Sequence, residues 1–489
     1  MSPLVFLTLT LSLSAQDVGR DAVESLDFPP LVFEPPVAQE YEVEGVPIFH
    51  LHDPTLPLVD VQLQLVGGSS HFPRTQLAAV SAFPFVLRRG GTTSLPADSI
   101  DLMVDLLALQ LTVGSSGGGT TIRLNALRER IGPGMRLLGD MLLTPAFDPQ
   151  ALDVWRGQAA ERIRRRDDNP AGLAFAEFNR LMYGDHPVGW VMDDEELLPE
   201  RLSVESLRAL HPILICKDRL ILGVSGDLEW EEAEPLVREF LEPWRDCPDG
   251  LTPAPEPEIR SDPGIFVLPR QIDQTTVILG QPSDVQQEDS PEYFAAQIAD
   301  RLLGAGGFSS RILSRVRTEE GLAYGASSVW TTPLRYQGLV GALTATSAET
   351  TIRATSLLLE ILRDFRNTPP GAEEIQGAVE EITTGYPFAF QSPSQIVSRQ
   401  MLHRAQGLPD GWIARFLAGL GEVTEASVAS VVAENLEPDR MTILLVGDPS
   451  RFDTGLEALN PVFELQSDGS YHPWISPELE RGVSQQSPP

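Results

Sequence analysis

Histidine is the side chain in this sequence best suited to binding a metal ion, and the chain contains seven of them. No two histidines stand four residues apart, the spacing that would place both imidazoles on one face of a helix. His50 and His52 stand two residues apart in a strand-like run, where they would share a face beside Asp53. This spacing allows a metal site, but we prefer to interpret the pair as two solvated imidazoles at a strand edge.

Other motifs that would identify an enzyme class are absent from the sequence. It contains no nucleophile elbow, no phosphate-binding loop and no Cys-x-x-Cys pair. The glycine-rich run at 114–119 lacks the Lys-Ser/Thr of a phosphate loop, so we interpret it as a hairpin turn. The arginines within residues 162–166 could face an acidic partner, but we prefer a solvated helix face paired with Asp167 and Asp168.

Arg317 and Tyr324 lie in a stretch, residues 306–330, whose pattern predicts a helix followed by a strand. Two glycines and two serines begin it, and apolar residues then recur at helical spacing. Gly321 can end that helix in a left-handed conformation, and residues 322–327 alternate as on a strand. The pattern therefore places Arg317 in the last helical turn and Tyr324 on the following strand, although an ordinary helix–turn–strand corner would look the same.

The elements of the chain occur twice in the same order. Three pairs of similar segments are separated by one offset of 221 residues. They comprise a hydroxyl residue that opens a helix, an arginine before an apolar strand, and a Gly-Asp at the end of that strand. The pairs are Ser203 with Thr424, Arg219 with Arg440, and Asp227 with Asp448. A shared offset across three kinds of element predicts a tandem duplication of one domain.

A proline-rich segment, residues 249–263, separates the two copies. Its four prolines and lack of apolar periodicity predict a stiff linker. We therefore expect an N-terminal domain at 41–248, a C-terminal domain at 264–462 and a tail at 463–489. Several strands follow one another directly, which predicts an α+β fold with an antiparallel sheet and helices packed on one face in each domain.

The first residues predict an exported protein. Residues 1–16 contain a short apolar run that resembles a secretory signal peptide, and residues 17–40 predict an extended lead-in. No segment is long enough to be a transmembrane helix, so we expect a periplasmic or otherwise exported location. The net charge of −33 argues against nucleic acid or an anionic membrane surface as a partner.

The chain has two cysteines, Cys216 and Cys247. Two cysteines are too few for a disulfide framework or, by themselves, for a zinc site. Cys216 lies in an apolar, strand-like run, so we prefer to interpret it as a buried thiol. A single disulfide is the alternative if the protein is exported.

Short motifs follow one another in a fixed order along residues 41–460. They are Arg88–Thr92, Leu143–Phe147, Arg164–Pro170, Tyr183–Pro187 and Gly321–Tyr324. In this order, on two tandem domains, they resemble the pitrilysin/insulinase family of zinc peptidases, which includes the subunits of mitochondrial processing peptidase. In that family an Arg and a Tyr at the last motif help to hold the substrate peptide, so the resemblance implies this role for Arg317 and Tyr324.

Active members of that family carry His-x-x-Glu-His on a helix just before the Gly-Thr of the first motif. The two imidazoles bind zinc and the glutamate acts as the base on the zinc-bound water. This sequence has no such residues at the matching positions, and Pro84 inside the motif is expected to disturb the helix. The three matching positions are Ala82, Phe85 and Val86.

The third zinc ligand of active members is a glutamate on a later helix, and its position here is Arg162. Glu161 is adjacent, but one residue along a helix rotates a side chain by about 100°. All ligands are therefore missing together. The resemblance implies no metal in this chain and zinc in a partner subunit.

We expect, by this resemblance, a non-catalytic subunit of a bacterial two-subunit peptidase, with a zinc-bearing homologue as its partner and a peptide or unfolded polypeptide as its substrate. Arg317 would pair with a carbonyl or carboxylate of the peptide, and Tyr324 would donate to the developing oxyanion. One alternative is a peptide-binding or scaffold protein without peptidase activity. A self-sufficient zinc peptidase would need ligands that this chain lacks.

Overall fold

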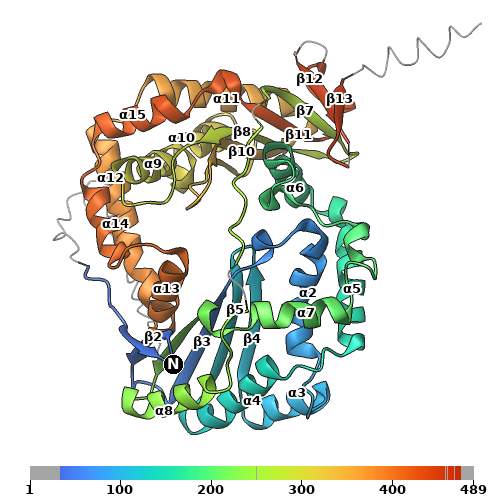
Figure 1. The fold of residues 1–489 in the computed structure, drawn as a ribbon. Coiled ribbons are helices and arrows are strands. Elements are labelled where there is room, and N and C mark those ends of the chain that lie inside the picture. Colours follow the sequence, from blue (N-terminus) through green and yellow to red (C-terminus); the bar gives the residue numbers. More distant parts are fainter. Residues whose placement is uncertain are drawn as a thin grey trace, which may run out of the picture. The chain divides into compact units, whose positions relative to one another are not determined.

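The strand segments of each half of the chain form a separate sheet (Figure 1). This computed structural model describes residues 33–248, 251–260, 262–456, 459, 461–466 and 468–474. The chain divides into two units, Met1–Glu34 and Pro35–Pro489, and the fold described below belongs to the second. The predicted signal peptide, most of the lead-in and the end of the tail lie outside the described residues.

The first sheet has six strands in the order β1-β2-β6-β3-β5-β4. Its strands are β1 (Gln39–Val43), β2 (Val46–His52), β3 (Leu58–Val66), β4 (Gln110–Ser116), β5 (Gly119–Leu127) and β6 (Leu220–Gly226). Neighbouring strands are antiparallel except β2 and β6, which are parallel. The glycine-rich run forms the β4–β5 hairpin, as predicted.

The second sheet has seven strands in the order β13-β12-β7-β11-β8-β10-β9. They are β7 (Gly264–Pro269), β8 (Gln274–Ser283), β9 (Ala326–Trp330), β10 (Gly338–Ser347), β11 (Thr442–Gly447), β12 (Val462–Leu465) and β13 (Tyr471–Pro473). Here β7 is parallel to both β11 and β12, so this sheet is also mixed rather than strictly antiparallel.

The two sheets repeat one topology, because the order β2-β6-β3-β5-β4 corresponds to β7-β11-β8-β10-β9. The helices before β6 and β11 are α7 (Val204–Leu214) and α15 (Glu425–Asn435), whose bounds differ by the predicted 221 residues. The side chains of Ser203 and Thr424 each accept a hydrogen bond from the backbone N–H three residues on. The side chain of that later residue accepts the N–H of Ser203 or Thr424, so two backbone donors at the start of each helix are satisfied. The α+β fold and the duplication are therefore confirmed.

Helices cover one face of each sheet and form the two main cores with it. In the first half these are α2 (Leu77–Arg89), α3 (Ala97–Leu106), α4 (Ile131–Leu143), α5 (Pro149–Arg164), α7 and α8 (Trp230–Leu241). In the second half they are α9 (Pro291–Asp300), α10 (Arg311–Leu313), α11 (Thr351–Asn367), α12 (Ala372–Gly385), α14 (Trp412–Gly421) and α15.

Each half also places one helix on the sheet of the other half (Figure 1). Helix α6 (Pro170–Tyr183) belongs to the first half, and its Phe178 packs against β8 of the second sheet, near Gly280. Helix α13 (Pro393–Gln406) belongs to the second half and packs on β6, where a side chain at Gly223 would meet Val397. The sequence does not predict this exchange, which covers the second face of both sheets.

The backbone of the linker is held by hydrogen bonds to the first half of the chain. The Nδ1 atom of His71 lies 2.8 Å from the Thr252 carbonyl oxygen, and Nε2 of His186 lies 2.7 Å from that of Pro255. The Arg260 N–H donates to the Met182 carbonyl on α6. The domain boundaries expected on either side of this linker stay a prediction.

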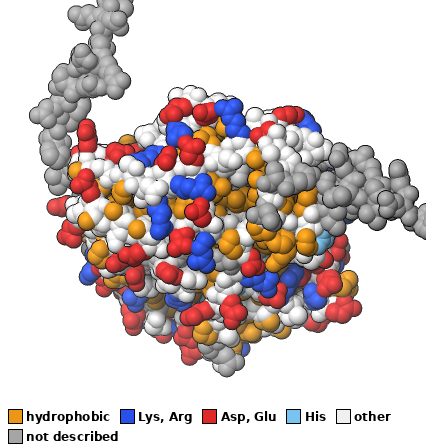
Figure 2. Space-filling view, turned by 90° about the horizontal axis from the view of Figure 1, so that it is seen from above, with side chains coloured by type: hydrophobic (Ala, Val, Ile, Leu, Met, Phe, Trp, Pro, Cys, Tyr) orange, Lys and Arg blue, Asp and Glu red, His pale blue; other side chains and the backbone are white. Residues whose placement is uncertain are grey.

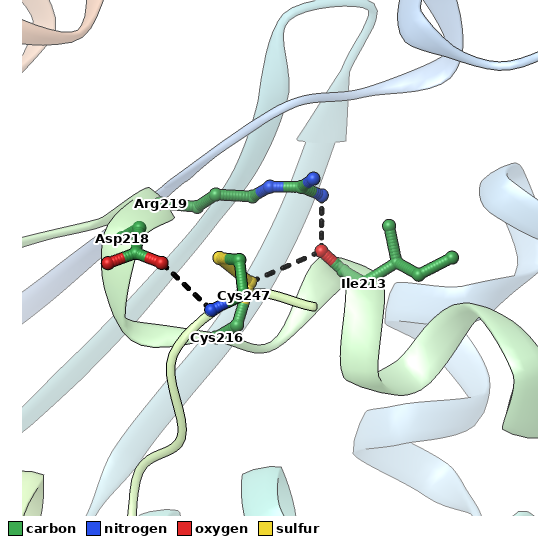
Figure 3. The surroundings of a disulfide bond; sticks show 5 residues. All are labelled: Ile213, Cys216, Asp218, Arg219 and Cys247. Atoms are coloured by element: carbon green, nitrogen blue, oxygen red, sulfur yellow. Dashed lines mark hydrogen bonds between the residues drawn. A yellow bond between two sulfur atoms is a disulfide. The ribbon is translucent and has the colours of Figure 1, made fainter. Parts of the chain in front are cut away.

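Cys216 is not the buried free thiol that its apolar surroundings favour, because it forms a disulfide with Cys247 (Figure 3). The segment after α8 returns to the start of β6, where the Lys217 N–H donates to the Arg245 carbonyl. Asp218 then accepts the N–H of Cys247 at 2.8 Å. The disulfide therefore fastens the residues before the linker to the first sheet.

Across the described ranges, no individual helix combines the length and apolar character that a membrane span needs. One pair of segments, Trp412–Gly421 and Glu425–Arg440, reaches this length and apolar character only when both are counted together, and a bend of 103° separates them.

Candidate functional site

The helix that corresponds to the zinc-binding helix is α2, and its inner face is apolar. Ala82 and Val86 are fully buried in the first core, and Phe85 is partly buried against it. The helix runs unbroken from Leu77 to Arg89 through Pro84, so the expected disturbance does not occur. Proline removes one backbone donor, but the packing of the apolar face compensates for one lost bond. None of these side chains can bind a metal.

The position of the third zinc ligand is also occupied by a side chain that is unsuited to binding zinc. Arg162 is exposed on α5, and its guanidinium carbon lies 5.8 Å from the ring centre of Trp155. The adjacent Glu161 pairs with Arg164 and Arg165, which lower its pKa. Within the part of the chain that the structure describes, no group of three His, Cys, Asp or Glu side chains could hold a metal ion.

The His50–His52 pair is not two solvated imidazoles. His50 is only 4% exposed, and its Nε2 lies 2.8 Å from the Leu228 carbonyl oxygen, while burial lowers its pKa. His52 is half-buried and lies near Asp227 and Glu229. The expectation of an exposed pair is wrong because the Leu228 carbonyl gives His50 a buried partner.

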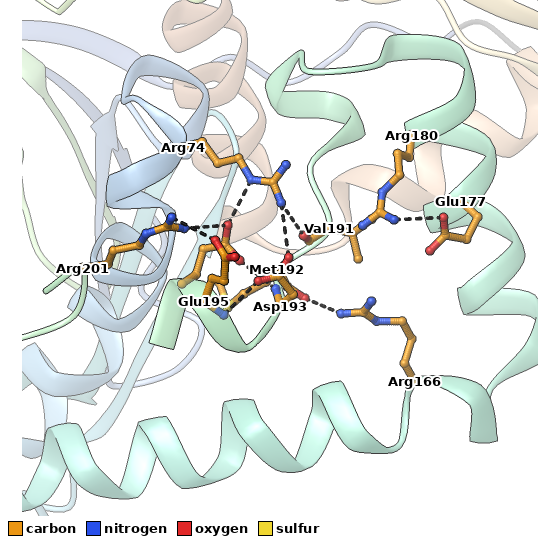
Figure 4. A network of polar contacts seen from close by, with 10 residues as sticks. Arg74, Arg166, Glu177, Arg180, Val191, Met192, Asp193, Glu195 and Arg201 are labelled. Atoms are coloured by element: carbon orange, nitrogen blue, oxygen red, sulfur yellow. Dashed lines mark hydrogen bonds and ion pairs between the residues drawn. The ribbon is translucent and has the colours of Figure 1, made fainter. Parts of the chain in front are cut away.

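The arginines at 162–166 do not pair with the acids that follow them. Arg166 donates to the Met192 carbonyl, as Figure 4 shows, and Asp167 instead pairs with Arg270 at 3.1 Å. The predicted pairing with Asp167 and Asp168 is therefore not the one formed, because α6 brings the Asp167 turn close to the second half of the chain.

A second cluster surrounds the buried Glu196, which is 1% exposed, and Figure 4 labels its partners Arg74 and Arg201. Its Oε1 atom lies 3.0 Å from Nε of Arg74 and 3.4 Å from NH1 of Arg201. On α6, Glu177 is 2% exposed and pairs with Arg180 at 3.4 Å, and burial raises its pKa. Both carboxylates have arginine partners, so we interpret these clusters as structural.

The strongest candidate site lies between α10 and β9. After the short α10, a π-helical segment, Ser314–Glu319, carries Arg317 in its last turn. Gly321 follows with a φ of 63°, the left-handed value expected for a residue that ends a helix. These two parts of the sequence prediction agree with the structure.

Tyr324, however, does not lie on a strand. Strand β9 begins at Ala326, so Tyr324 lies in the loop before it and is 84% exposed. The alternating residues form a loop rather than a strand, because Thr344 and Thr346 of β10 bind the carbonyls of this segment through their side chains. The two serines at the start also differ from expectation: their hydroxyls donate to Gly306 and Gly307 rather than accepting from the helix.

Arg317 is stacked against two exposed aromatic rings. Its guanidinium carbon lies 4.2 Å from the ring centre of Tyr324 and 4.8 Å from that of Phe308, which is 68% exposed. A guanidinium stacked on an aromatic ring keeps its N–H donors directed outward in its own plane. Phe308 is a member of this cluster that no sequence pattern identifies, because its exposure depends on the fold.

The acids around Arg317 pair with other arginines. Glu319 pairs with Arg315, and Glu320 pairs with Arg353 of α11. Elsewhere, acidic and basic side chains are interspersed over the face shown in Figure 2. Across the described residues, no carboxylate forms an ion pair with Arg317. The cluster can therefore present a cation to a carbonyl or carboxylate, next to a phenol that can donate a hydrogen bond.

Comparison with known families supports the resemblance found in the sequence. Residues 201–382 match the family described as the peptidase M16 inactive domain. The non-peptidase homologue YmxG of Helicobacter pylori is 20% identical over 84% of this chain and 94% of its own length. An uncharacterized zinc protease of Bacillus subtilis, also called YmxG, is 22% identical over 73% of this chain and 85% of its own.

Solved structures share the fold. A peptidase M16 inactive domain from Pseudomonas fluorescens superposes with a TM-score of 0.74 at 22% identity, covering 84% of this chain and 98% of that one. The periplasmic protease PqqL from Escherichia coli superposes with a TM-score of 0.70 at 13% identity, covering 92% of this chain and 49% of that one. Together with the duplicated fold, these likenesses show that the chain resembles the peptidase M16 (pitrilysin/insulinase) family, and the positions that match the zinc ligands carry other residues.

Proposed function

We propose that this chain is the non-catalytic subunit of a heteromeric M16 peptidase, in which it binds the peptide and completes the site of a zinc-bearing homologue. Support comes from two features that occur together. The positions of the zinc ligands are filled by Ala82, Phe85, Val86 and Arg162, whereas Arg317 and Tyr324 are retained in contact with each other. A chain that lacks these ligands and contributes a peptide-binding pair would need a partner to act in proteolysis.

The stacked Arg317 is the observation that carries this proposal. In a chain with 69 Asp and Glu against 36 Lys and Arg, Arg317 forms no ion pair within the described structure and contacts two aromatic rings instead. Phe308 and Tyr324 hold its plane, so little side-chain entropy is lost when it binds. The pair suits a peptide carbonyl or carboxylate better than a free anion, since its aromatic rings offer apolar contact beside the charge.

The two side chains would have different tasks on a bound peptide. Arg317 would donate to a carbonyl or carboxylate and fix the register of the chain. The Tyr324 hydroxyl would donate to the oxygen that becomes negative as the peptide bond is attacked in the partner's site. Zinc and the attacking water would both belong to the partner subunit.

The first test is an affinity pull-down of the tagged chain from its native cells, with the co-purifying chains identified. A stoichiometric homologue that carries His-x-x-Glu-His is the expected result. Recovery of the chain alone, or with unrelated envelope proteins, would instead favour a peptide-binding or scaffold protein.

The second test uses the purified complex. We expect Arg317→Ala and Tyr324→Phe to lower its peptidase activity at least tenfold. Arg399→Ala is the matched control, because Arg399 also stacks on aromatic rings, those of Tyr386 and Phe390, but lies on α13. Full activity of the Arg317 and Tyr324 variants would refute their assigned roles.

We also propose that the protein is exported. The Cys216–Cys247 disulfide supports this, because such bonds persist in oxidising compartments and are rare in the cytosol. Cell fractionation, with alkylation of free thiols before and after reduction, tests it. An oxidised protein in the periplasmic or culture fraction is expected, and a reduced protein in the cytosolic fraction would contradict it.

A further inference from the structure

The loop that carries Tyr324 is attached to the sheet by side chains rather than by a strand ladder. Pairing of β9 with β10 ends at Ala326 opposite Thr344. Beyond that point the Thr344 hydroxyl donates to the Gly325 carbonyl at 2.8 Å. The Thr346 hydroxyl donates to the Leu322 carbonyl at 2.7 Å. The two bonds therefore hold the chain on both sides of Tyr324.

Both threonines are only 1% exposed, which limits what their hydroxyls can do. A buried hydroxyl without a partner is costly, so each must keep its bond to the loop. The Thr346 oxygen also lies 2.7 Å from the hydroxyl oxygen of Thr350, which can donate to it at the start of α11. Valine has nearly the same shape and would fill these positions, so packing alone does not require threonine.

The side chain of Tyr324 has little other support. At 84% exposure it contacts few atoms apart from the Arg317 guanidinium. The position of its ring is therefore set by the backbone of residues 322–325. The hydroxyls of Thr344 and Thr346 hold that backbone by hydrogen bonds to its carbonyls. Nearby, Glu320 pairs with Arg353 and the Leu322 N–H donates to the Val316 carbonyl, so the start of the loop is held as well.

We infer that Thr344 and Thr346 are positioning residues, whose hydroxyls clamp the Leu322–Gly325 loop so that Tyr324 lies over Arg317 and the pair is preformed for a peptide. This inference rests on the proposed peptide-binding function of Arg317 and Tyr324. A preformed site loses less entropy on binding than one that must order its loop. Loss of the clamp is therefore expected to weaken peptide binding without removing any group that touches the peptide.

The test compares Thr344→Val, Thr346→Val and the double variant with Thr344→Ser and Thr346→Ser, which keep the hydroxyl. Thr355→Val is the matched control, because the buried Thr355 hydroxyl bonds only within α11, to the Thr351 carbonyl at 2.8 Å. Two quantities are measured on the full chain. One is the hydrogen–deuterium exchange of the Leu322 amide, whose N–H donates to the Val316 carbonyl. The other is the affinity for fluorescein-labelled, reduced and carboxymethylated lactalbumin, an unfolded polypeptide.

The double valine variant is expected to exchange the Leu322 amide at least tenfold faster and to bind the polypeptide five- to tenfold more weakly. The serine variants and Thr355→Val are expected to match the parent in both measurements. If the double variant does not fold, each single valine variant is compared with its serine counterpart. Parental exchange and affinity in the valine variants would overturn the inference.

The same binding assay separates this inference from the proposed function. Arg317→Ala removes a group that would touch the peptide and leaves both threonines intact. If Arg317→Ala binds the polypeptide as well as the parent, the peptide-binding function itself fails. If Arg317→Ala weakens binding and the valine variants do not, only the clamp is refuted.

Discussion

The guanidinium of Arg317 lies 4.2 Å from the ring centre of Tyr324, and the two side chains come from opposite sides of the turn at Gly321. Their contact depends on that turn and on the loop that follows it. Because Tyr324 is largely exposed, substituting it changes the site and hardly changes the core. This separation makes the pair suitable for experiments in which function and folding are measured independently.

Two substitutions of Tyr324 distinguish its ring from its hydroxyl. Tyr324→Phe keeps the stack on Arg317 and removes the donor, so we expect kcat of the complex with the zinc-bearing partner to fall about 100-fold with little change in KM. Tyr324→Ala also frees Arg317 and should raise KM. Both variants should unfold within about 0.5 kcal/mol of the parent in urea. Equal kinetics for the two variants would contradict separate roles.

Asp300, at the end of α9, should make stability depend on pH. Burial raises its pKa from 3.8 to about 6, and the Ser328 hydroxyl binds it. The folded chain therefore keeps this proton to a higher pH than the unfolded chain, so the free energy of unfolding falls between about pH 4 and pH 6 and stays lower above that range. The loss is roughly 3 kcal/mol.

Asp300→Asn cannot ionise and can still accept from Ser328. We expect it to match the parent at pH 4 and to be more stable at pH 8, as measured by urea unfolding at both values. Asp105→Asn, at an exposed position on α3, is the control and should leave the pH dependence unchanged. A variant less stable than the parent at pH 8 would show that the charged carboxylate stabilises the fold.

The disulfide should contribute strongly to stability. Cys216 and Cys247 are 31 residues apart, and closing a loop of that length stabilises the folded state by about 3–4 kcal/mol through the unfolded chain. We therefore expect Cys216→Ser with Cys247→Ser to unfold at a lower urea concentration than the oxidised parent. A reducing agent should destabilise the parent and leave the double variant unaffected.

The contact between α13 and the first sheet should not tolerate a methyl group at Gly223. A Cβ atom there would lie 2.4 Å from Val397 and 2.5 Å from Met401, so Gly223→Ala should cost about 1–3 kcal/mol. Gly157→Ala is the control, since its Cβ atom on α5 would meet nothing within 4 Å and should stabilise the helix by up to about 1 kcal/mol. Thermal unfolding of both variants measures the contrast, and equal effects would argue against tight packing at Gly223.

Metal removal should have no effect on this chain. With Ala82, Phe85, Val86 and Arg162 at the ligand positions, zinc has no binding groups there. Protein purified without chelator should contain less than about 0.1 zinc per chain, because the described residues include no group of three His, Cys, Asp or Glu side chains that could hold the ion. EDTA should leave its melting temperature unchanged. One zinc per chain, with hydrolysis blocked by the chelator, would instead indicate a self-sufficient peptidase.

Local sequence signals predicted the fold well where one residue decides the structure. Ser203 and Thr424 each begin a helix because their side chains bind free N–H groups nearby, and Gly321 ends one because it can adopt a positive φ. The 221-residue offset then revealed the duplication without any knowledge of contacts.

Features that depend on distant contacts were not predictable in this way. The loop at Tyr324 looks like a strand until Thr344 and Thr346, about 20 residues later, bind its carbonyls. The burial of His50 depends on the Leu228 carbonyl, and the disulfide depends on the return of the chain after α8. The family resemblance pointed to Arg317 and Tyr324 as a pair but not to Phe308 beside them, whose position depends on the fold.

The exchange of α6 and α13 suggests how such a chain could have arisen. A single ancestral copy, alone, would have left one apolar face of its sheet in water. Two copies that exchanged this helix would have formed a two-fold symmetric dimer and buried the apolar faces of both sheets. Gene duplication and a linker then join the partners permanently, after which either copy is free to lose residues that the other retains.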